Sequence, residues 1–279
     1  MERIKSAIDK HNKQEANSTI RATRQIVIGQ PKVQNEPVNK TAQKLENVNY
    51  FQTRVVKLHA DHLEKHHIIA FNKDVPAGEH FDLLRTKILQ KMEAKGWRTL
   101  AITSPTMEAG KTLVAINLAM SIAQQTDKTA MLVDFDLRRP KLGAYLGIPM
   151  EKSLNDFLDG SAELQDVLVN PGIPRLVVLP TKSAVKKSSE ILSSQRIANL
   201  INELRERYES RIVIFDLPPV LVADDVIALM PQIDCILMVI ANGATTKREI
   251  EDSFHLLPAE KIIGTVLNKA EVEPNAYYY

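Results

Sequence analysis

Short apolar runs alternate with amphipathic stretches from Glu79 to about residue 270. The runs read as strands at Thr99–Thr103, Ala130–Val133, Leu176–Leu179, Arg211–Phe215, Cys235–Ile240 and Ile262–Leu267. The amphipathic stretches predict helices over Glu79–Lys95, Thr112–Gln125 and Ser194–Tyr208. Near-continuous apolar strands separated by helices are typical of a mostly parallel sheet with helices on both faces. The pattern therefore predicts an α/β fold.

The first 70 residues follow a different pattern. Ile4 and Ile8 lie at helical spacing before Lys13, and residues 14–48 are polar with little periodicity. We expect an N-terminal helix and a flexible, partly disordered linker over 1–70, a folded domain over 71–270 and a tail over 271–279. Within the domain, the serine-rich segment 182–194 predicts a loop that leads into a capped helix.

Charge and composition narrow the classes of function. The chain has 36 basic and 34 acidic side chains, and this balance argues against a nucleic-acid partner. Its one cysteine, Cys235, lies in an apolar run and is expected to be a small buried hydrophobe. No apolar stretch reaches the roughly 18 to 20 residues that span a bilayer, so we expect a cytoplasmic protein.

The chemistry begins after the first predicted strand of the domain. Residues 104–112 lie between that strand and a helix, the context of a phosphate-binding loop, and end in Gly110, Lys111 and Thr112. Free N–H groups at the helix start can hold phosphate. Lys111 would contact the β- and γ-phosphates of ATP, and the Thr112 hydroxyl would bind Mg²⁺.

Two further motifs place carboxylates at strand ends. Asp134 and Asp136 follow one predicted strand, and Asp216 ends another before Pro218 and Pro219. The carboxyl ends of parallel strands are where α/β sheets bind ligands. An apolar strand that ends in Asp is the Walker B arrangement, in which the carboxylate helps to hold Mg²⁺. The three motifs together predict a Mg–ATP site.

These motifs resemble those of a known family. Residues 134–140, Asp-Phe-Asp-Leu-Arg-Arg-Pro, resemble the second ATP motif of bacterial tyrosine autokinases (BY-kinases), which share the fold of the MinD/ParA P-loop ATPases. Residues 79–88, 189–194, 216–219 and 264–269 resemble further segments of the family. The N-terminal helix and residues 112–122 resemble its cytoplasmic subtype, which is linked to exosortase-type exopolysaccharide clusters.

The resemblance implies roles for individual residues. Asp134 would be the base for the incoming tyrosine, Asp136 and Asp216 would hold Mg²⁺ together with Thr112, and Lys111 would contact the phosphates. Asn268 would contact adenine. The implied nucleotide-binding set is Glu108, Ala109, Gly110, Lys111, Thr112, Leu113 and Asn268, and the implied catalytic set is Lys111, Asp134, Asp136 and Asp216.

The resemblance also implies a substrate and partners. Tyr277, Tyr278 and Tyr279 resemble the tyrosine cluster that these kinases phosphorylate, and transfer between the subunits of a ring is expected. Glu79 and Arg85 match the helix motif that closes the ring. The implied activator is a membrane polysaccharide co-polymerase (chain-length determinant), which would hold the kinase at the inner face of the cell membrane, and a tyrosine phosphatase would oppose it.

Three positions depart from the family pattern. Pro105 and Glu108 stand where glycine is usual, which predicts a lower ATP affinity or rate because Glu108 is not free to adopt positive φ. Asp82 replaces the first arginine of the ring motif and places ring assembly in doubt. A weakly active nucleotide-binding scaffold is therefore one alternative to a kinase that regulates exopolysaccharide or capsule synthesis or export.

A ParA/MinD-like positioning ATPase is the other alternative. That class carries an extra lysine early in the loop, where this chain has Thr106. His59, His62 and His66 also fall on one helical face, but no cysteine or carboxylate completes a metal site, so we favour a polar surface. Arg138 could contact phosphate or a neighbouring subunit.

Overall fold

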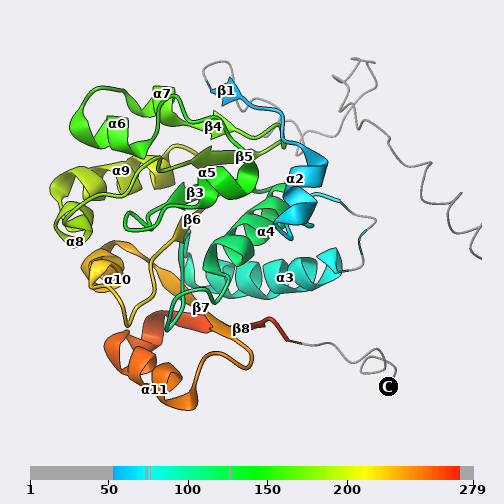
Figure 1. Ribbon diagram of the computed structural model, residues 1–279, viewed down its shortest axis with the longest axis vertical. Helices are drawn as coiled ribbons and strands as arrows, with labels where there is room; N and C mark the ends of the chain where they lie inside the picture. The colour runs from blue at the N-terminus through cyan, green and yellow to red at the C-terminus, as the bar shows by residue number, and fades with distance from the viewer. Residues whose placement is uncertain (1–52, 73–74, 76, 126, 271–279) are drawn as a thin grey trace, which may run out of the picture. The chain divides into compact units, whose positions relative to one another are not determined.

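The computed structural model describes residues 53–72, 75, 77–125 and 127–270. The predicted N-terminal helix and the linker over 14–48, and the tail over 271–279, lie outside these residues. Within them, eight strands form one sheet in the order β1-β4-β5-β3-β6-β2-β7-β8 (Figure 1). Neighbouring strands in this sheet are parallel, except that β4 and β5 are antiparallel. The strands are β1 (Arg54–Val55), β2 (Thr99–Thr103), β3 (Thr129–Asp134), β4 (Val169–Asn170), β5 (Leu176–Leu179), β6 (Arg211–Asp216), β7 (Cys235–Ala241) and β8 (Ile262–Asn268).

Helices cover both faces of the sheet, as the apolar pattern predicts. One core joins α2 (Ala60–Lys65), α3 (Gly78–Lys95), α4 (Lys111–Ala123) and α5 (Leu142–Leu146) to one face. The other core joins α6 (Leu154–Asp159), α7 (Leu164–Val167), α8 (Ser188–Leu192), α9 (Gln195–Glu206) and α10 (Asp225–Leu229) to the opposite face (Figure 1). The chain also forms α11 (Lys247–Leu256) and the short 3-10 helices η2 (Met230–Gln232) and η3 (Ala259–Lys261).

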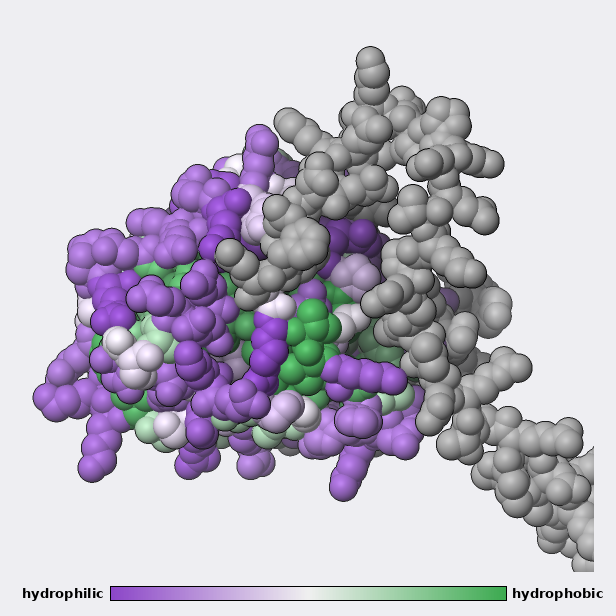
Figure 2. All heavy atoms as spheres, turned by 90° about the horizontal axis from the view of Figure 1, so that it is seen from above, coloured by the Kyte–Doolittle hydropathy of each residue, from purple (hydrophilic) through white to green (hydrophobic). Residues whose placement is uncertain are grey.

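Alternate residues of the central strands enter the two cores. In β3, Leu132 packs with α4, while Met131 and Val133 face the side of α9. The period of two is that of a β-strand whose faces are both covered, so every position of β3 is buried. Most of the surface seen in Figure 2 is hydrophilic, and hydrophobic residues gather near its centre. Among the described residues, no helix has the length and apolar character needed to cross a membrane.

The folded domain begins earlier than the predicted boundary at residue 71. β1 pairs with β4 at the edge of the sheet, and the side chains of Leu63 and Ile68 are buried in the first core. Asn117 of α4 accepts hydrogen bonds from the backbone N–H groups of Ile69 and Ala70 at 2.8 and 2.9 Å. The boundary was wrong because a two-residue strand and a six-residue helix carry too little periodicity to be recognised.

The serine-rich segment 182–194 also differs from its prediction as a loop. It contains the short helix α8, whose Leu192 is buried in the second core. The predicted cap at the end of the segment is confirmed, since the Ser194 hydroxyl accepts a hydrogen bond from the N–H of Ile197.

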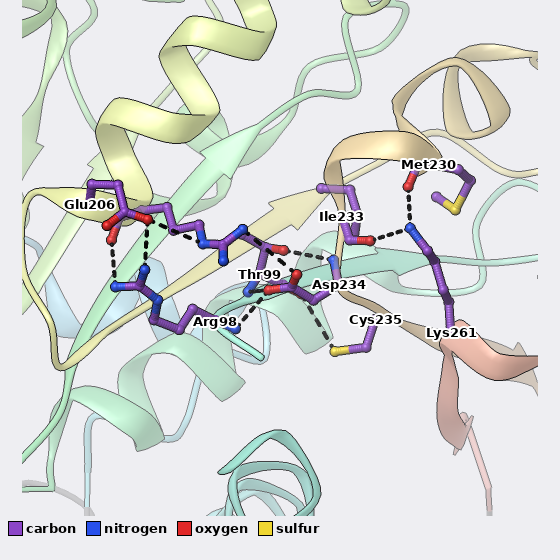
Figure 3. A network of polar contacts seen from close by, with 9 residues as sticks. Arg98, Thr99, Glu206, Met230, Ile233, Asp234, Cys235 and Lys261 are labelled. Carbon is purple, nitrogen blue, oxygen red and sulfur yellow. Dashed lines mark hydrogen bonds and ion pairs between the residues drawn. The ribbon is translucent and has the colours of Figure 1, made fainter. Parts of the chain in front are cut away.

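A polar network joins the starts of β2 and β7, at the edge of the sheet opposite the P-loop (Figure 3). Asp234 Oδ2 accepts from the backbone N–H groups of Arg98 and Thr99 at 2.8 and 2.9 Å, and the Thr99 hydroxyl accepts from the N–H of Asp234. Lys261 Nζ donates to the carbonyls of Met230, the first residue of η2, and of Ile233, which follows η2. Cys235 is buried beside this network, as predicted, and burial raises the pKa of its thiol to about 12.

Candidate nucleotide-binding site

The loop between β2 and α4 has the shape of a phosphate cradle. Its last residue, Gly110, has φ +92°, a conformation that L side chains rarely adopt. α4 starts at Lys111 and is thirteen residues long, so its first N–H groups and the positive end of its dipole face the loop. The predicted strand, loop and helix are therefore all present at this position.

Glu108 also adopts a left-handed conformation, with φ +61°. The sequence led us to expect that glutamate could not adopt positive φ, but the loop holds it there at a backbone cost of roughly 1–2 kcal/mol. Glu108 thus occupies a conformation that glycine adopts without this cost.

We expect Glu108→Gly to raise the free energy of unfolding by about 0.5–1 kcal/mol, because relief of the strained φ outweighs the extra entropy of glycine in the unfolded chain. Denaturant titration of both proteins measures the difference. The matched control is Glu209→Gly, at an exposed turn residue outside the left-handed region, which should be neutral or destabilising. If Glu108→Gly and Glu209→Gly destabilised the protein equally, Glu108 would not be strained.

The carboxylates predicted from the sequence meet at the ends of two neighbouring strands. β3 and β6 pair so that Asp134 lies opposite Asp216. The Thr112 hydroxyl of α4 donates to Asp216 Oδ2 at 2.5 Å. Lys111 Nζ lies 3.8 Å from Asp136 Oδ2, and both side chains are about nine-tenths buried. The P-loop and the two strand-end motifs therefore form one site.

Burial dominates the electrostatics of this carboxylate cluster. Burial raises the pKa of Asp134 well above its usual range, and the negative charge of Asp216 raises it further. Burial also raises the pKa of Asp216 to about 6, although Lys111 and the Thr112 hydroxyl act in the opposite direction. The pKa of Asp136 is raised by burial and lowered in part by Lys111. Burial and mutual repulsion thus favour the protonated form of these carboxylates, and a bound cation would favour their ionised form.

The raised pKa of Asp216 predicts how stability depends on pH in protein free of nucleotide and Mg²⁺. The folded protein binds the proton on the Asp216 carboxyl more tightly than the unfolded chain does. Protonation of Asp216 therefore stabilises the folded state. This contribution is complete below pH 3.8, the ordinary pKa of an aspartate, and is lost as pH rises through about 6, the pKa of Asp216 in the folded protein. We expect wild type to lose about 1 kcal/mol more stability than Asp216→Asn between about pH 5 and pH 7. Denaturant titration with a chelator present measures this, and parallel curves would contradict it.

The oxygen atoms of the site fit a Mg²⁺ ion. Within the described residues, Asp134 Oδ1 and Asp216 Oδ1 are buried and have no hydrogen-bond partner. An unpartnered buried carboxylate oxygen is costly, and carboxylate and hydroxyl oxygens are the ligands that Mg²⁺ prefers. Asp216 and the Thr112 hydroxyl, already in contact, could hold the ion, and the charge of Asp136 also acts on Asp216.

A cavity of about 290 Å³ opens over this cluster. Asp136 faces it, whereas Asp134 is fully buried and is not among its lining residues. The lining residues are Met107, Glu108, Gly110, Lys111, Thr112, Leu113, Asp136, Arg138, Arg139, Lys141, Tyr145, Pro218, Pro219 and Val222. Of the predicted nucleotide-binding residues, Ala109 and Asn268 are therefore the two that do not line it.

Arg138, which the sequence singled out, lines the cavity together with Lys141 and Tyr145, which it did not. Arg138 donates through Nε and Nη2 to Asp225 Oδ1 at 3.1 and 2.9 Å, which fixes its guanidinium between the loop after β3 and α10. Tyr145 reaches the cavity from α5, and Lys141 reaches it from the position just before α5. No motif marks Asp225 in the sequence, because an aspartate is common at the start of a helix. Its contact with Arg138 is seen only in the structure, where α10 packs beside the site.

Comparison with known proteins identifies the family. A family model described as an AAA domain matches residues 98–256, more than half of the 279 residues. The chain belongs to the AAA domain family. Among curated relatives, tyrosine-protein kinase ptk of Acinetobacter johnsonii is 31% identical over 209 residues, which cover 74% of this chain and 28% of that protein. The chain spans less than a third of the length of such relatives.

Other relatives match this AAA domain over most of their own length. Tyrosine-protein kinase CpsD of Streptococcus pneumoniae serotype 4 is 29% identical over 204 residues, covering 72% of this chain and 88% of that protein. The solved kinase domain of the Escherichia coli tyrosine kinase ETK is 26% identical with a TM-score of 0.68, covering 81% of this chain and 91% of that one. The resemblance to bacterial tyrosine kinases and the P-loop fold of MinD/ParA type are thus confirmed.

Two groups of predicted residues lie away from the site of the AAA domain. Arg85 of α3 donates to Asp82 Oδ1 at 2.7 Å and to the backbone and hydroxyl oxygens of Ser121 on α4. Asp82, the departure from the ring motif, therefore holds Arg85 within the chain. Glu79 is exposed at the start of α3. A role for Glu79 and Arg85 in assembly stays a prediction.

His62 of α2 and His66, which follows that helix, use ring nitrogens in contacts within the chain. His62 Nε2 donates to the Ala144 carbonyl at 2.9 Å, and His66 Nδ1 donates to the His62 carbonyl at 2.8 Å. The ring of His66 also lies 5.2 Å from that of Tyr145. α2 therefore packs on α5, whose Tyr145 faces the cavity. Within the described ranges, these histidines belong to no cluster of three side chains that could hold a metal ion.

Proposed function

We propose that this protein is an ATP-dependent tyrosine autokinase that regulates exopolysaccharide or capsule synthesis or export. The observation that carries the proposal is the joined site, in which the Thr112 hydroxyl contacts Asp216 and Lys111 faces Asp136 below an open cavity. The relatives are named tyrosine-protein kinases, which supports tyrosine as the acceptor of the phosphoryl group.

Phosphate binding is the first task of the site. The N–H groups at the start of α4 and the Lys111 ammonium would hold the β- and γ-phosphates of ATP. Mg²⁺, held by Thr112, Asp216 and Asp136, would neutralise charge on the β- and γ-oxygens. Arg138, fixed by Asp225, lies where it can contact the transferred group or a neighbouring subunit. These residues position the γ-phosphate against an acceptor entering through the cavity.

Proton acceptance is the second task. A free tyrosine has a pKa of about 10, so its hydroxyl needs a base at neutral pH. Asp134 is the proposed base, because it lies opposite Asp216 at the ends of β3 and β6 and its Oδ1 has no hydrogen-bond partner. In the transfer, the tyrosine oxygen forms the new bond to the γ-phosphorus, the bond from that phosphorus to the β–γ bridging oxygen breaks, and the tyrosine proton goes to Asp134. The products are ADP and phosphotyrosine.

The acceptors and partners are proposed from the family. Tyr277, Tyr278 and Tyr279 are the proposed acceptors, each presented to the site of a neighbouring subunit. A membrane polysaccharide co-polymerase is the proposed activator and would keep the kinase at the inner face of the cell membrane. A tyrosine phosphatase would return the tail to its unmodified form.

Incubation of the full chain with ATP and Mg²⁺, followed by detection of phosphotyrosine, tests the proposal. Phosphotyrosine supports it. ATP binding by calorimetry without turnover, even with a candidate activator domain present, would indicate a nucleotide-binding scaffold instead. Nucleotide-dependent dimerisation with binding to DNA or lipid, and no phosphotyrosine, would indicate a positioning ATPase of the ParA/MinD kind.

A further inference from the structure

We propose that Asn268 is a positioning residue that sets the shape of the phosphate-binding loop, and this role rests on the proposed nucleotide site. Asn268 ends β8, and its side-chain Nδ2 donates to the backbone carbonyl of Ala109 at 2.8 Å. The two residues are 159 positions apart in the chain. The loop is therefore held by a strand outside the strand–loop–helix segment that forms it.

The loop and the asparagine are closely fitted to each other. A Cβ atom built on Gly110 would lie 2.1 Å from Asn268 Nδ2, a separation that real Cβ atoms do not tolerate. Gly110 also has φ +92°. Glycine is thus needed here for two reasons, its backbone conformation and the approach of the Asn268 amide.

The asparagine is itself held firmly by the sheet. Asn268 pairs with Ala241 in the register of β7 and β8, and its carbonyl accepts from the N–H of Asn242 at 2.8 Å. Its amide must present nitrogen to Ala109, because the opposite orientation would place two oxygen acceptors against each other. The sheet therefore fixes a donor at a set distance from the loop.

This bond acts on the atoms that bind phosphate. A trans peptide holds its C=O and N–H on opposite sides, so a fixed Ala109 carbonyl also fixes the direction of the Gly110 N–H. Gly110 and Lys111 both line the cavity. Backbone N–H groups in this position bind phosphate only when their directions converge, and Asn268 supplies the constraint that keeps one of them in place.

The role differs from the adenine contact that the family resemblance implies. A residue that contacts adenine affects only ligands that carry a base. A residue that shapes the loop affects any ligand with the phosphate chain, whether or not a base is attached. Inorganic tripolyphosphate, which has the phosphates of ATP and no base, separates the two roles.

Calorimetry with Mg²⁺ and either tripolyphosphate or ATP tests the proposal on the full chain. We expect Asn268→Ala to weaken both ligands by a similar factor of roughly tenfold, since one loop-ordering hydrogen bond is lost. Asn268→Asp keeps the size of the side chain but removes the donor, and should weaken both at least as much. The matched control is Asn242→Ala, which keeps the backbone bond to Asn268 and should bind both ligands as wild type does.

The possible outcomes distinguish failure of the positioning role of Asn268 from failure of the proposed nucleotide site. Weaker ATP binding with unchanged tripolyphosphate binding in Asn268→Ala would overturn the positioning role in favour of an adenine contact. Unchanged binding of both ligands would overturn any role in the loop. If wild type binds neither ligand, the nucleotide site fails and the positioning role fails with it.

Discussion

Replacement of Asp134 by asparagine is expected to lower the rate of phosphotyrosine formation by about 10²–10⁴-fold, the usual contribution of a positioned general base. The amide is nearly isosteric and can still accept the hydrogen bond from the N–H of Leu142, which Asp134 Oδ2 accepts at 3.0 Å. It cannot take the tyrosine proton. Because Asp134 is buried below the cavity, binding of ATP should change by no more than about threefold. Single-turnover assays and calorimetry measure the two effects separately.

Asp136→Asn is the matched comparison for this prediction. Asp136 faces the cavity beside Lys111, so its loss should weaken binding of ATP in the presence of Mg²⁺ as well as transfer. If Asp136→Asn abolished transfer with binding intact while Asp134→Asn remained active, the base would be Asp136. The assignment of Asp134 would then be wrong.

Lys111→Met is expected to weaken ATP binding by about 10²-fold and to abolish transfer, because a charge-assisted contact with the phosphates is lost from a buried site. Lys111 is about nine-tenths buried, and its Nζ forms an ion pair with Asp136 at 3.8 Å. Methionine fills a similar volume without charge. Calorimetry at a temperature where circular dichroism shows both proteins folded gives the ratio of affinities.

Lys141→Met is the control for that loss. Lys141 lines the same cavity but is exposed, so solvent screens its charge and its removal should cost far less affinity than removal of Lys111. Equal losses in the two variants would show that general positive charge, rather than the position of Lys111 at the start of α4, holds the phosphates.

Much of the fold follows from local sequence pattern. The central strands are buried on both faces, so each appears as an uninterrupted apolar run, and β2, β3, β5, β6, β7 and β8 all fall where such runs occur. The convergence of Lys111, Asp134 and Asp216 follows in the same way, because they stand at the ends of elements whose carboxyl or amino termini meet at one edge of a parallel sheet.

The features that the sequence did not reveal depend on tertiary packing. β1 and α2 are too short to show a period, and their place is fixed by pairing with β4 and by Asn117 of α4. The contact between Asn268 and Ala109 joins residues that are 159 positions apart in the chain, and no spacing predicts it. Glu108 holds a backbone conformation that its residue type disfavours, so only the surrounding loop determines it.

Phosphosite mapping tests the central claim most directly. The full chain, with ATP and Mg²⁺ and a candidate activator domain, is digested and analysed by mass spectrometry beside Lys111→Met treated in the same way. The account predicts phosphate on Tyr277, Tyr278 or Tyr279 in wild type and none in the variant. ATP binding by wild type with no phosphotyrosine anywhere in the chain would contradict it.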